Sequence, residues 1–363
     1  MNDKLKLLEP LSLGELKLAN RIFMAPLTRC RAGAGRVPNA MMRDYYVQRA
    51  SAGLILSEAT SVTAMGVGYP NTPGIWSPEQ TAGWKQVTAA VHGAGGKMFL
   101  QLWHVGRVSD PSYLDGALPV APSAIAPKGH VSLIRPHKSF VTPRALERSE
   151  LPGIIEAYRL GAANALAAGF DGVEIHGANG YLLDQFLQDS TNKRTDDYGG
   201  PIENRARLML EVTDAVISVW GAGRVGMHLA PRGDSHDMGD SNLATTFGYV
   251  AGELGRRKLA FLCARESLGP NRLGPELKKQ FGGFYVANEA HTRESAEQLL
   301  QTGEADAVAF GKAFIANPDL VKRFARNAPL NPPDPSTFYA DGPKGYTDYP
   351  ALAASEVTAA SAR

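Results

Sequence analysis

The sequence is poor in cysteine, in net charge and in long apolar runs, and each scarcity argues against a class of protein. Its 363 residues include two cysteines, Cys30 and Cys263, which disfavours a disulfide framework, a cysteine-based zinc site and a four-cysteine iron–sulfur cluster. Lys and Arg number 38 against 36 Asp and Glu, so we expect no nucleic-acid or membrane-surface partner. No apolar run reaches the roughly 18 residues of a membrane span, and no signal peptide is visible. We therefore expect a cytoplasmic protein.

Short apolar runs, each followed by a longer helix-like segment, dominate what is present. They are rich in Val, Ile, Leu and Phe, which is typical of strands buried on both faces. The runs span residues 21–28, 53–60, 97–104, 170–177, 224–231, 258–265, 282–289 and 305–312. Helical spacing or capping residues mark the segments 152–168, 204–220 and 292–303. This alternation predicts a single α/β domain over residues 1–363, a (β/α)8 TIM barrel, with a doubly wound sheet as the alternative.

Three segments fall outside this repeat. Residues 5–19 predict a hairpin with Gly14 at its turn, placed to plug the barrel floor. Residues 105–150 follow the third strand, carry many prolines and predict a lid-like insertion over the catalytic face. Residues 329–363 form a C-terminal extension, either a solvated tail or a folded flap that brings Tyr346 over a pocket. We expect its last residues to be disordered.

Three patterns that look like ligand sites are better explained as turns. The letters GAGRVG at 221–226 match a dinucleotide fingerprint, but a helix precedes them and a strand follows, which is the reverse of the required order. The letters GAGGK at 93–97 lack the first glycine and the Ser/Thr of a phosphate loop. The His and Asp residues within 228–237 match no metal-ligand spacing, and we predict no metal site.

In a (β/α)8 barrel the active site lies at the C-terminal strand ends, and in this sequence those ends hold few acids. Hydrolysis by paired carboxylates and Ser–His–Asp chemistry are therefore disfavoured. Neutral donors and acceptors suit a site that grips a planar heterocycle and polarises a carbonyl. The residues at these ends are Pro26, Leu27, Thr28, Ala59, Thr60, Gln101, Trp103, His104, His176, Asn179, Tyr181, His228, Gly311 and Lys312.

Six ordered motifs resemble the Old Yellow Enzyme family of FMN-dependent ene-reductases, which includes N-ethylmaleimide reductase-like proteins. They are MAPLTR (24–29), QLWHVGR (101–107), HGANGYLLDQFL (176–187), TDDYGGPIENRARL (195–208), AVAFGKAFIANPDL (307–320) and GYTDYP (345–350). The resemblance runs from about residue 5 to residue 350. It implies a (β/α)8 barrel that binds FMN at the strand ends, with NADPH or NADH as co-substrate.

The resemblance also implies a role for individual residues. His176 and Asn179 would donate hydrogen bonds to the carbonyl or nitro oxygen of the substrate, and Tyr181 would protonate the α-carbon once hydride has arrived from flavin N5. The cofactor-binding residues would be Pro26, Leu27, Thr28, Ala59, Gln101, His228, Asn288, Gly311 and Lys312. The substrate-binding residues would be Tyr69, Trp103, His176, Asn179 and Tyr346.

Three features depart from the family pattern around the cofactor. His228 and Lys312 stand where the family usually has arginine, and the segment 286–289 stands where it often has glycines beside the phosphate. Histidine is charged only part of the time at pH 7, and lysine lacks the bidentate fork of arginine. We therefore predict that FMN binds more weakly than the family pattern implies.

The leading interpretation is an enzyme that reduces the activated C=C bond of α,β-unsaturated carbonyl or nitro compounds with NAD(P)H, by ping-pong kinetics. A nitro-group or nitrate-ester reductase is the alternative, because the same His–Asn pair would hold a nitro oxygen. A catalytically silent flavin- or ligand-binding protein is an alternative of a different class. We expect a small-molecule substrate and a monomer or homodimer.

Overall fold

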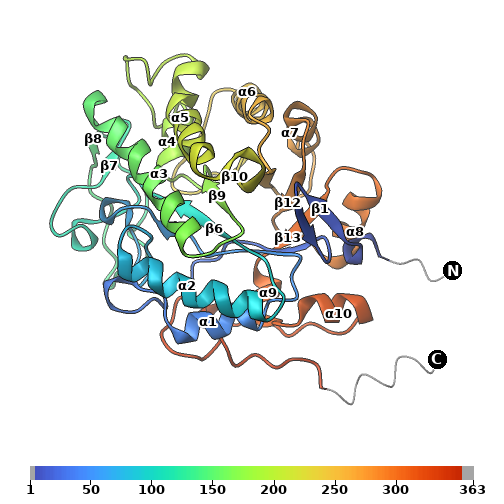
Figure 1. The fold of residues 1–363 in the computed structure, drawn as a ribbon. Helices are drawn as coiled ribbons and strands as arrows, with labels where there is room; N and C mark the ends of the chain where they lie inside the picture. The colour runs from blue at the N-terminus through green and yellow to red at the C-terminus, as the bar shows by residue number, and fades with distance from the viewer. Residues whose placement is uncertain (1–4, 354–363) are drawn as a thin grey trace.

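Parallel strands close into a barrel (Figure 1). The structure is a computed structural model that describes residues 5–353. Within this range the strands pair in parallel in the order β4, β3, β13, β12, β11, β10, β9, β6, and β6 pairs back onto β4 to close the ring. A short strand, β5 (Thr60–Ser61), lies beside β6. The strands are β3 (Ile22–Met24), β4 (Leu54–Leu56), β6 (Met98–Trp103), β9 (Gly172–His176), β10 (Val225–Leu229), β11 (Phe261–Arg265), β12 (Tyr285–Asn288) and β13 (Ala307–Phe310). The closed ring confirms the predicted (β/α)8 barrel over the doubly wound alternative.

Helices cover the outside of the barrel (Figure 1). Strand residues alternate between the two sides: Ile22 and Met24 pack in the core shared with the helices, whereas Phe23 faces the barrel interior. Both faces of each strand are thus buried, which explains the unbroken apolar runs. The helices are α1 (Ala40–Val47), α2 (Pro78–Gly93), α3 (Leu151–Ala167), α4 (Leu182–Leu187), α5 (Ile202–Trp220), α6 (Leu243–Arg256), α7 (Gly274–Phe281), α8 (Arg293–Gln301), α9 (Lys312–Ala316) and α10 (Leu320–Arg326).

The barrel interior is apolar near the floor and polar above it. Phe99 and Phe261 meet there with ring centroids 5.9 Å apart. Gly226 leaves room for this contact, because a Cβ at that position would lie 2.2 Å from the Phe261 ring. The next inward-facing residues toward the C-terminal strand ends are Gln101, Glu174, His228 and Cys263.

A hairpin closes the floor, as predicted. Strands β1 (Leu11–Leu13) and β2 (Leu16–Leu18) pair antiparallel, and Gly14 takes a φ of +57° at the turn between them. Leu13, Leu16 and Leu18 are buried in the same cluster as the floor phenylalanines. The C-terminal face is therefore the open end of the barrel.

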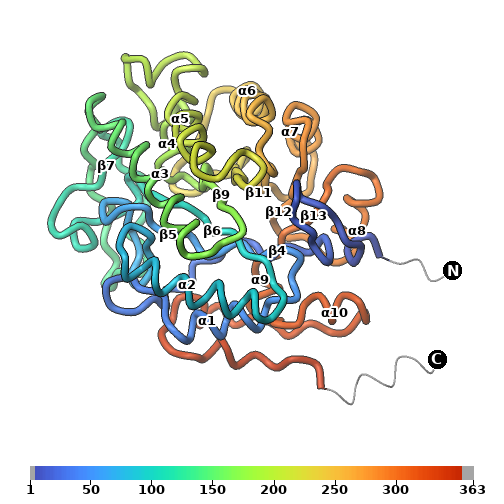
Figure 2. The backbone as a smooth tube through the Cα atoms, viewed as in Figure 1, coloured from blue at the N-terminus to red at the C-terminus, as the bar shows by residue number. Residues whose placement is uncertain are grey.

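The two other predicted segments are the insertion at residues 105–150 and the C-terminal extension at residues 329–363. In the insertion, β7 (Val120–Ala121) pairs in parallel with β8 (Arg144–Ala145). The C-terminal extension is a folded flap rather than a solvated tail: over residues 329–353 it runs beside α1 and the N-terminal part of the chain (Figure 2). The expectation of disorder at the chain end concerns residues 354–363, which lie outside the described range.

The two glycine-rich patterns lie between a helix and the strand that follows it, as predicted. Residues 221–226 link α5 to β10, and residues 93–97 link α2 to β6, so neither forms a phosphate loop. Across residues 5–353, no helix is both long and apolar enough to cross a bilayer.

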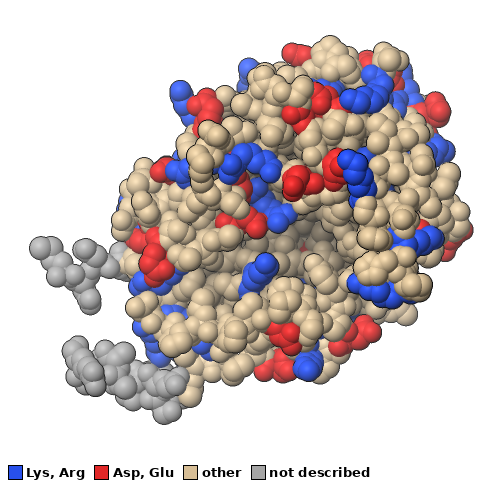
Figure 3. Space-filling model, turned by 180° about the vertical axis from the view of Figure 1, so that it is seen from behind, with Lys and Arg blue, Asp and Glu red and all other residues tan. Residues whose placement is uncertain are grey.

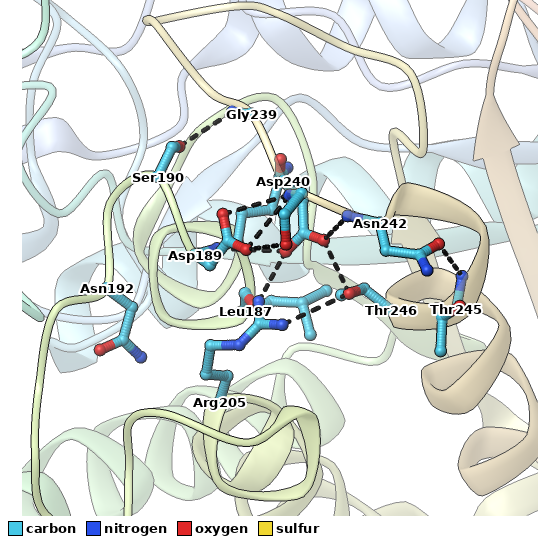
Figure 4. Close-up of polar contacts among 12 residues, drawn as sticks. Leu187, Asp189, Ser190, Asn192, Arg205, Gly239, Asp240, Asn242, Thr245 and Thr246 are labelled. Atoms are coloured by element: carbon cyan, nitrogen blue, oxygen red, sulfur yellow. Dashed lines mark hydrogen bonds and ion pairs between the residues drawn. The ribbon is translucent and has the colours of Figure 1, made fainter.

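A buried ion pair fastens the loop after β10 to α5 (Figure 4). Arg205 Nη1 lies 2.6 Å from Asp240 Oδ2, and the side chains are 5% and 0% exposed. The backbone N–H of Asn242 and the hydroxyl of Thr246 donate to the other Asp240 oxygen, at 2.8 and 2.9 Å. Burial alone would raise the pKa of Asp240, but these hydrogen bonds together with that from Arg205 lower it. Residues 230–242 are thereby held over the turn between β9 and α4.

We predict that Asp240→Asn strongly destabilises the protein. The substitution leaves the buried guanidinium of Arg205 without a counter-charge, which costs about 3–5 kcal/mol of unfolding free energy. Urea denaturation followed by circular dichroism measures this. The matched control is Asp214→Asn, which breaks the more exposed pair with Arg257 and should cost only about 0–1 kcal/mol. Equal losses in the two variants would contradict the prediction.

Candidate active site

Three adjoining cavities lie at the C-terminal strand ends, and the face seen in Figure 3 is hollowed near its centre. The wide cavity, of about 420 Å³, is lined among the predicted residues by Pro26, Leu27, Thr28, Asn179, His228, Asn288, Gly311 and Lys312. The inner pocket, of about 90 Å³, is lined by Pro26, Thr28, Ala59, Gln101, Trp103, His176, Asn179, Tyr181 and His228. The outer pocket, of about 490 Å³, is lined by Tyr69, Asn179 and Tyr181 together with residues of the insertion. The structure therefore brings together every predicted site residue except Tyr346.

His176, at the end of β9, is a neutral hydrogen-bond donor. The backbone N–H of Ala178 donates to His176 Nδ1 at 3.3 Å, so the proton of the neutral ring is on Nε2. Burial, and next the nearby His228, hold the pKa of His176 well below its usual range. The ring stacks at 6.3 Å on Trp103, which fixes its plane.

Tyr181 and Tyr69 form a hydroxyl pair. Their oxygens are 2.8 Å apart, and the Tyr181 ring stands edge-on to His176 at 5.0 Å. Burial, followed by the neighbouring Tyr69, raises the pKa of Tyr181 well above its usual value. Tyr181 is therefore protonated at neutral pH, and both tyrosines also line the outer pocket.

The turn that carries these groups is held by its backbone. Asn179 and Gly180 have φ values of 59° and 76°, in the left-handed region. A Cβ on Gly180 would lie 2.6 Å from the carbonyl oxygen of Ser235, so glycine is required there. The Gly180 N–H donates to Asp184 Oδ2 at 2.8 Å, and burial raises the pKa of Asp184 to about 7.

Asn179 is held from two sides. Arg265 Nη1 donates to Asn179 Oδ1 at 3.0 Å. His236 Nδ1 lies 2.7 Å from the Asn179 carbonyl oxygen. His236 thus holds the turn after β9, while Asp237 pairs with Lys128 at 3.2 Å.

A polar layer lies directly beneath the inner pocket. Gln101 Nε2 donates to Glu174 Oε2 at 2.8 Å, and His228 Nδ1 lies 3.6 Å from the same carboxylate oxygen. Ligand-type atoms of Glu174, His228 and Cys263 all lie within 4.8 Å of one another. Within the described residues, His228 Nε2 and Glu174 Oε1 are buried without a hydrogen-bond partner.

Tyr346 lies elsewhere, which corrects the expectation that it lines the substrate pocket. It is 0% exposed and stacks on Tyr45, with ring centroids 4.1 Å apart. The guanidinium of Arg31 lies 4.5 Å from the Tyr346 ring centroid. This cation–π contact and the stacking hold the ring in the core. Tyr339, from the same extension, lines both the wide cavity and the outer pocket.

Comparison with known proteins identifies the family. The family model described as "NADH:flavin oxidoreductase / NADH oxidase family" matches residues 6–331. The chain belongs to this family. It is therefore an oxidoreductase, and the resemblance to Old Yellow Enzymes is confirmed.

Relatives from this family match along nearly their whole length. The chain is 43% identical to 12-oxophytodienoate reductase 1 of Oryza sativa subsp. japonica, covering 95% of this chain and 93% of that protein. It is 43% identical to a probable flavin mononucleotide-dependent alkene reductase of Leishmania infantum, covering 95% and 97%. The structure of morphinone reductase in complex with tetrahydroNAD has a TM-score of 0.93 at 49% identity, covering 96% and 98%. The old yellow enzyme homologue from Zymomonas mobilis also has a TM-score of 0.93, at 45% identity, covering 96% and 100%.

The cavities fit the flavin of this family. His228 lines both the wide cavity and the inner pocket, and among the residues that the structure describes its Nε2 has no hydrogen-bond partner, which fits a site that awaits a heterocycle with its own hydrogen-bonding atoms. Lys312, at the start of α9, lines the wide cavity and could bind a phosphate there. In the segment 286–289, Asn288 and Glu289 line the wide cavity, and Glu289 pairs with Arg265.

Several site residues were not predicted from the sequence. Arg265 ends the apolar run FLCAR, and a charged residue at the end of a strand could have identified it as a candidate site residue. Glu174 could have been identified from the alternation of side chains along β9, which directs it into the barrel. Tyr339 and His236 lie in irregular segments whose side-chain directions no periodicity reveals.

Glu58, just after β4, is buried beside Arg29 and Tyr46. The Tyr46 hydroxyl donates to its Oε1 at 3.3 Å, and the backbone N–H of Arg29 to its Oε2 at 3.4 Å. Burial raises the pKa of Glu58 from 4.5 to about 7, against the opposing effect of the Arg29 N–H. The folded state therefore holds this proton more tightly than the unfolded state does, and the stability it contributes is lost as pH rises from 4.5 through 7.

We predict that the stability of the wild type relative to Glu58→Gln falls as pH rises from about 5 to about 8. The glutamine amide of the variant cannot ionise, so the variant does not lose folding stability in this way as pH rises. Urea unfolding midpoints across the range measure the difference. The control is Glu156→Gln: a hydrogen bond from Arg159 lowers the pKa of Glu156, which therefore stays ionised over the whole range. A constant difference between wild type and Glu58→Gln would contradict the prediction.

Proposed function

We propose that the protein reduces the activated C=C bond of α,β-unsaturated carbonyl or nitro compounds, with NAD(P)H as the source of electrons. The observation that carries this is the inner pocket, where a neutral imidazole, an amide and a protonated phenol converge with no carboxylate in its lining. Two relatives, a probable alkene reductase and a 12-oxophytodienoate reductase, support the same reaction class.

Bound FMN supplies the hydride that is transferred to the β-carbon. His176 Nε2–H and the Asn179 amide donate hydrogen bonds to the substrate oxygen, where negative charge builds up as the C=C electrons move toward it. Because His176 is neutral, it stabilises this charge without giving up its proton. Tyr181 then donates its hydroxyl proton to the α-carbon, and Tyr69 passes a replacement proton from the outer pocket through the 2.8 Å hydroxyl contact.

NAD(P)H and the alkene use the same site in turn, so we expect ping-pong kinetics. The wide cavity would hold the cofactor: Lys312 would bind its phosphate, and Thr28 and His228, with Gln101 from the adjoining inner pocket, would contact its ring. Asn288 and Gly311 complete the wall of that cavity at the ends of β12 and β13. The morphinone reductase structure, which contains tetrahydroNAD, supports a nicotinamide as the electron donor.

The direct test is a pair of anaerobic half-reactions. We expect NADPH or NADH to bleach the flavin, and cyclohexenone or a nitroalkene to restore the oxidised spectrum. Tyr181→Phe should slow reoxidation by the enone by about 100-fold or more, because it removes the proton donor, while flavin reduction changes little. Tyr158→Phe, which removes a buried hydroxyl on α3, is the control and should change neither step. A flavin that no nicotinamide reduces, or product formation unaffected by Tyr181→Phe, would contradict the proposal.

We further propose that FMN is held weakly, and that His228→Arg tightens it. A permanent guanidinium beside Glu174 would add a fixed charge at the ring edge of the cofactor. We expect the FMN dissociation constant to fall in His228→Arg and to rise about tenfold in Lys312→Met, which loses a charged phosphate contact. Flavin fluorescence on dilution measures both, with Lys85→Met on the outer surface of α2 as the control. Full occupancy of the wild type that survives dilution would contradict weak binding.

A further inference from the structure

The side chain of Arg265 connects the catalytic turn to the far wall of the wide cavity. Arg265 is the last residue of β11 and lines both the wide cavity and the outer pocket. Its Nη1 donates to Asn179 Oδ1 at 3.0 Å, and its Nε donates to Glu289 Oε2. The guanidinium thus binds Asn179 through one nitrogen and Glu289 through another, although the Arg265 side chain is 38% exposed.

This contact decides which end of the Asn179 amide faces the pocket. An arginine has N–H donors and no acceptor, so only the amide oxygen can bind it. The amide nitrogen then points away from Arg265, and within the described residues Asn179 Nδ2 makes no hydrogen bond to the protein. The NH2 group is therefore free to donate to a ligand, whereas a rotated amide would present its oxygen to the substrate oxygen and repel it.

The backbone of Asn179 does not by itself fix the side chain. Its φ of 59° sets the direction of Cβ, and His236 contacts its carbonyl oxygen at 2.7 Å. Neither the φ angle nor the His236 contact distinguishes the two orientations of the amide, because neither constrains the terminal oxygen and nitrogen of the side chain. Arg265 is the contact that does.

Glu289 holds Arg265 in place for this task. Glu289 follows β12 and has a φ of 104°, and the next residue, Ala290, has a φ of 55°. Two successive non-glycine residues with positive φ form a conformationally strained turn. The turn they form directs the carboxylate toward β11, where it meets the guanidinium.

We propose that Arg265, held by Glu289, is a positioning residue that fixes the Asn179 amide with its N–H toward the substrate oxygen. This inference rests on the proposed function, because it concerns the residue that polarises the substrate. The competing explanation is that the Arg265–Glu289 pair only ties β11 to the segment after β12. The two explanations differ in whether the effect of Arg265 depends on Asn179.

A double-mutant cycle separates them. The variants are Asn179→Ala, Arg265→Met and the double variant, with rates normalised to flavin content. The readouts are the rate of flavin reoxidation by cyclohexenone and the dissociation constant of cyclohexanone from the oxidised enzyme. We expect Asn179→Ala to slow reoxidation about 100-fold and Arg265→Met to slow it about tenfold. In the Asn179→Ala background, Arg265→Met should have almost no further effect.

Two further variants sharpen the cycle. Glu289→Gln keeps the shape of the residue but weakens its hold on Arg265, so its effect should be smaller than that of Arg265→Met and should vanish once Arg265 is absent. The matched control is Arg232→Met, which breaks another Arg–Glu pair of the same rim, Arg232 Nε with Glu266 at 2.6 Å, without contact to Asn179. It should leave both readouts unchanged.

The outcomes separate this inference from the proposed function. If Asn179→Ala itself has no effect on reoxidation or ligand binding, the proposed role of Asn179 is wrong, and this inference falls with it. If Asn179→Ala slows flavin reoxidation but Arg265→Met has the same effect in the wild type and in the Asn179→Ala variant, the proposed function stands and the positioning role of Arg265 is overturned. Loss of the Arg265→Met effect in the Asn179→Ala background supports the inference.

Discussion

In a closed parallel barrel, strand register decides which side chains can meet. Gln101 is level with Glu174, and His228 with Cys263. The side chains of Glu174, His228 and Cys263 meet inside the barrel, with their polar atoms within 4.8 Å of one another. The floor phenylalanines and the β1–β2 hairpin shield this polar layer from below. On its other side the layer adjoins the inner pocket, which Gln101 and His228 line. The chemistry of the site is therefore confined to one end of the barrel by how its other end is packed.

The turn from His176 to Tyr181 depends on contacts that come from far along the chain. Its left-handed residues are held by Asp184 from α4 and by His236 from the loop after β10. That loop is in turn held by the buried pair of Arg205 and Asp240. A pocket of about 90 Å³ thus takes its geometry from a network that extends well beyond its lining.

The sequence was sufficient for the barrel and for most of the cavity lining, because alternation along a strand fixes which side chains point inward and at which end. It was not sufficient where irregular segments contribute. Tyr339 and Tyr346 lie in one Pro- and Gly-rich extension, and the choice between them depends on Arg31, which donates to the Thr337 carbonyl 306 residues away. The contact of Arg265 with Asn179 depends likewise on a left-handed turn in another part of the chain.

The C-terminal extension has a consequence for how the protein is made. Phe338 and Tyr339 form part of the wall of the wide cavity. They are secured by arginines near the other end of the chain, such as Arg29, which donates to the Gly345 carbonyl across a separation of 316 residues. During synthesis these arginines leave the ribosome long before their acceptors exist. The barrel strands are complete by residue 310, yet the cofactor cavity gains its last wall only after the extension has followed. The cavity is therefore complete only once the C-terminal extension has been synthesised.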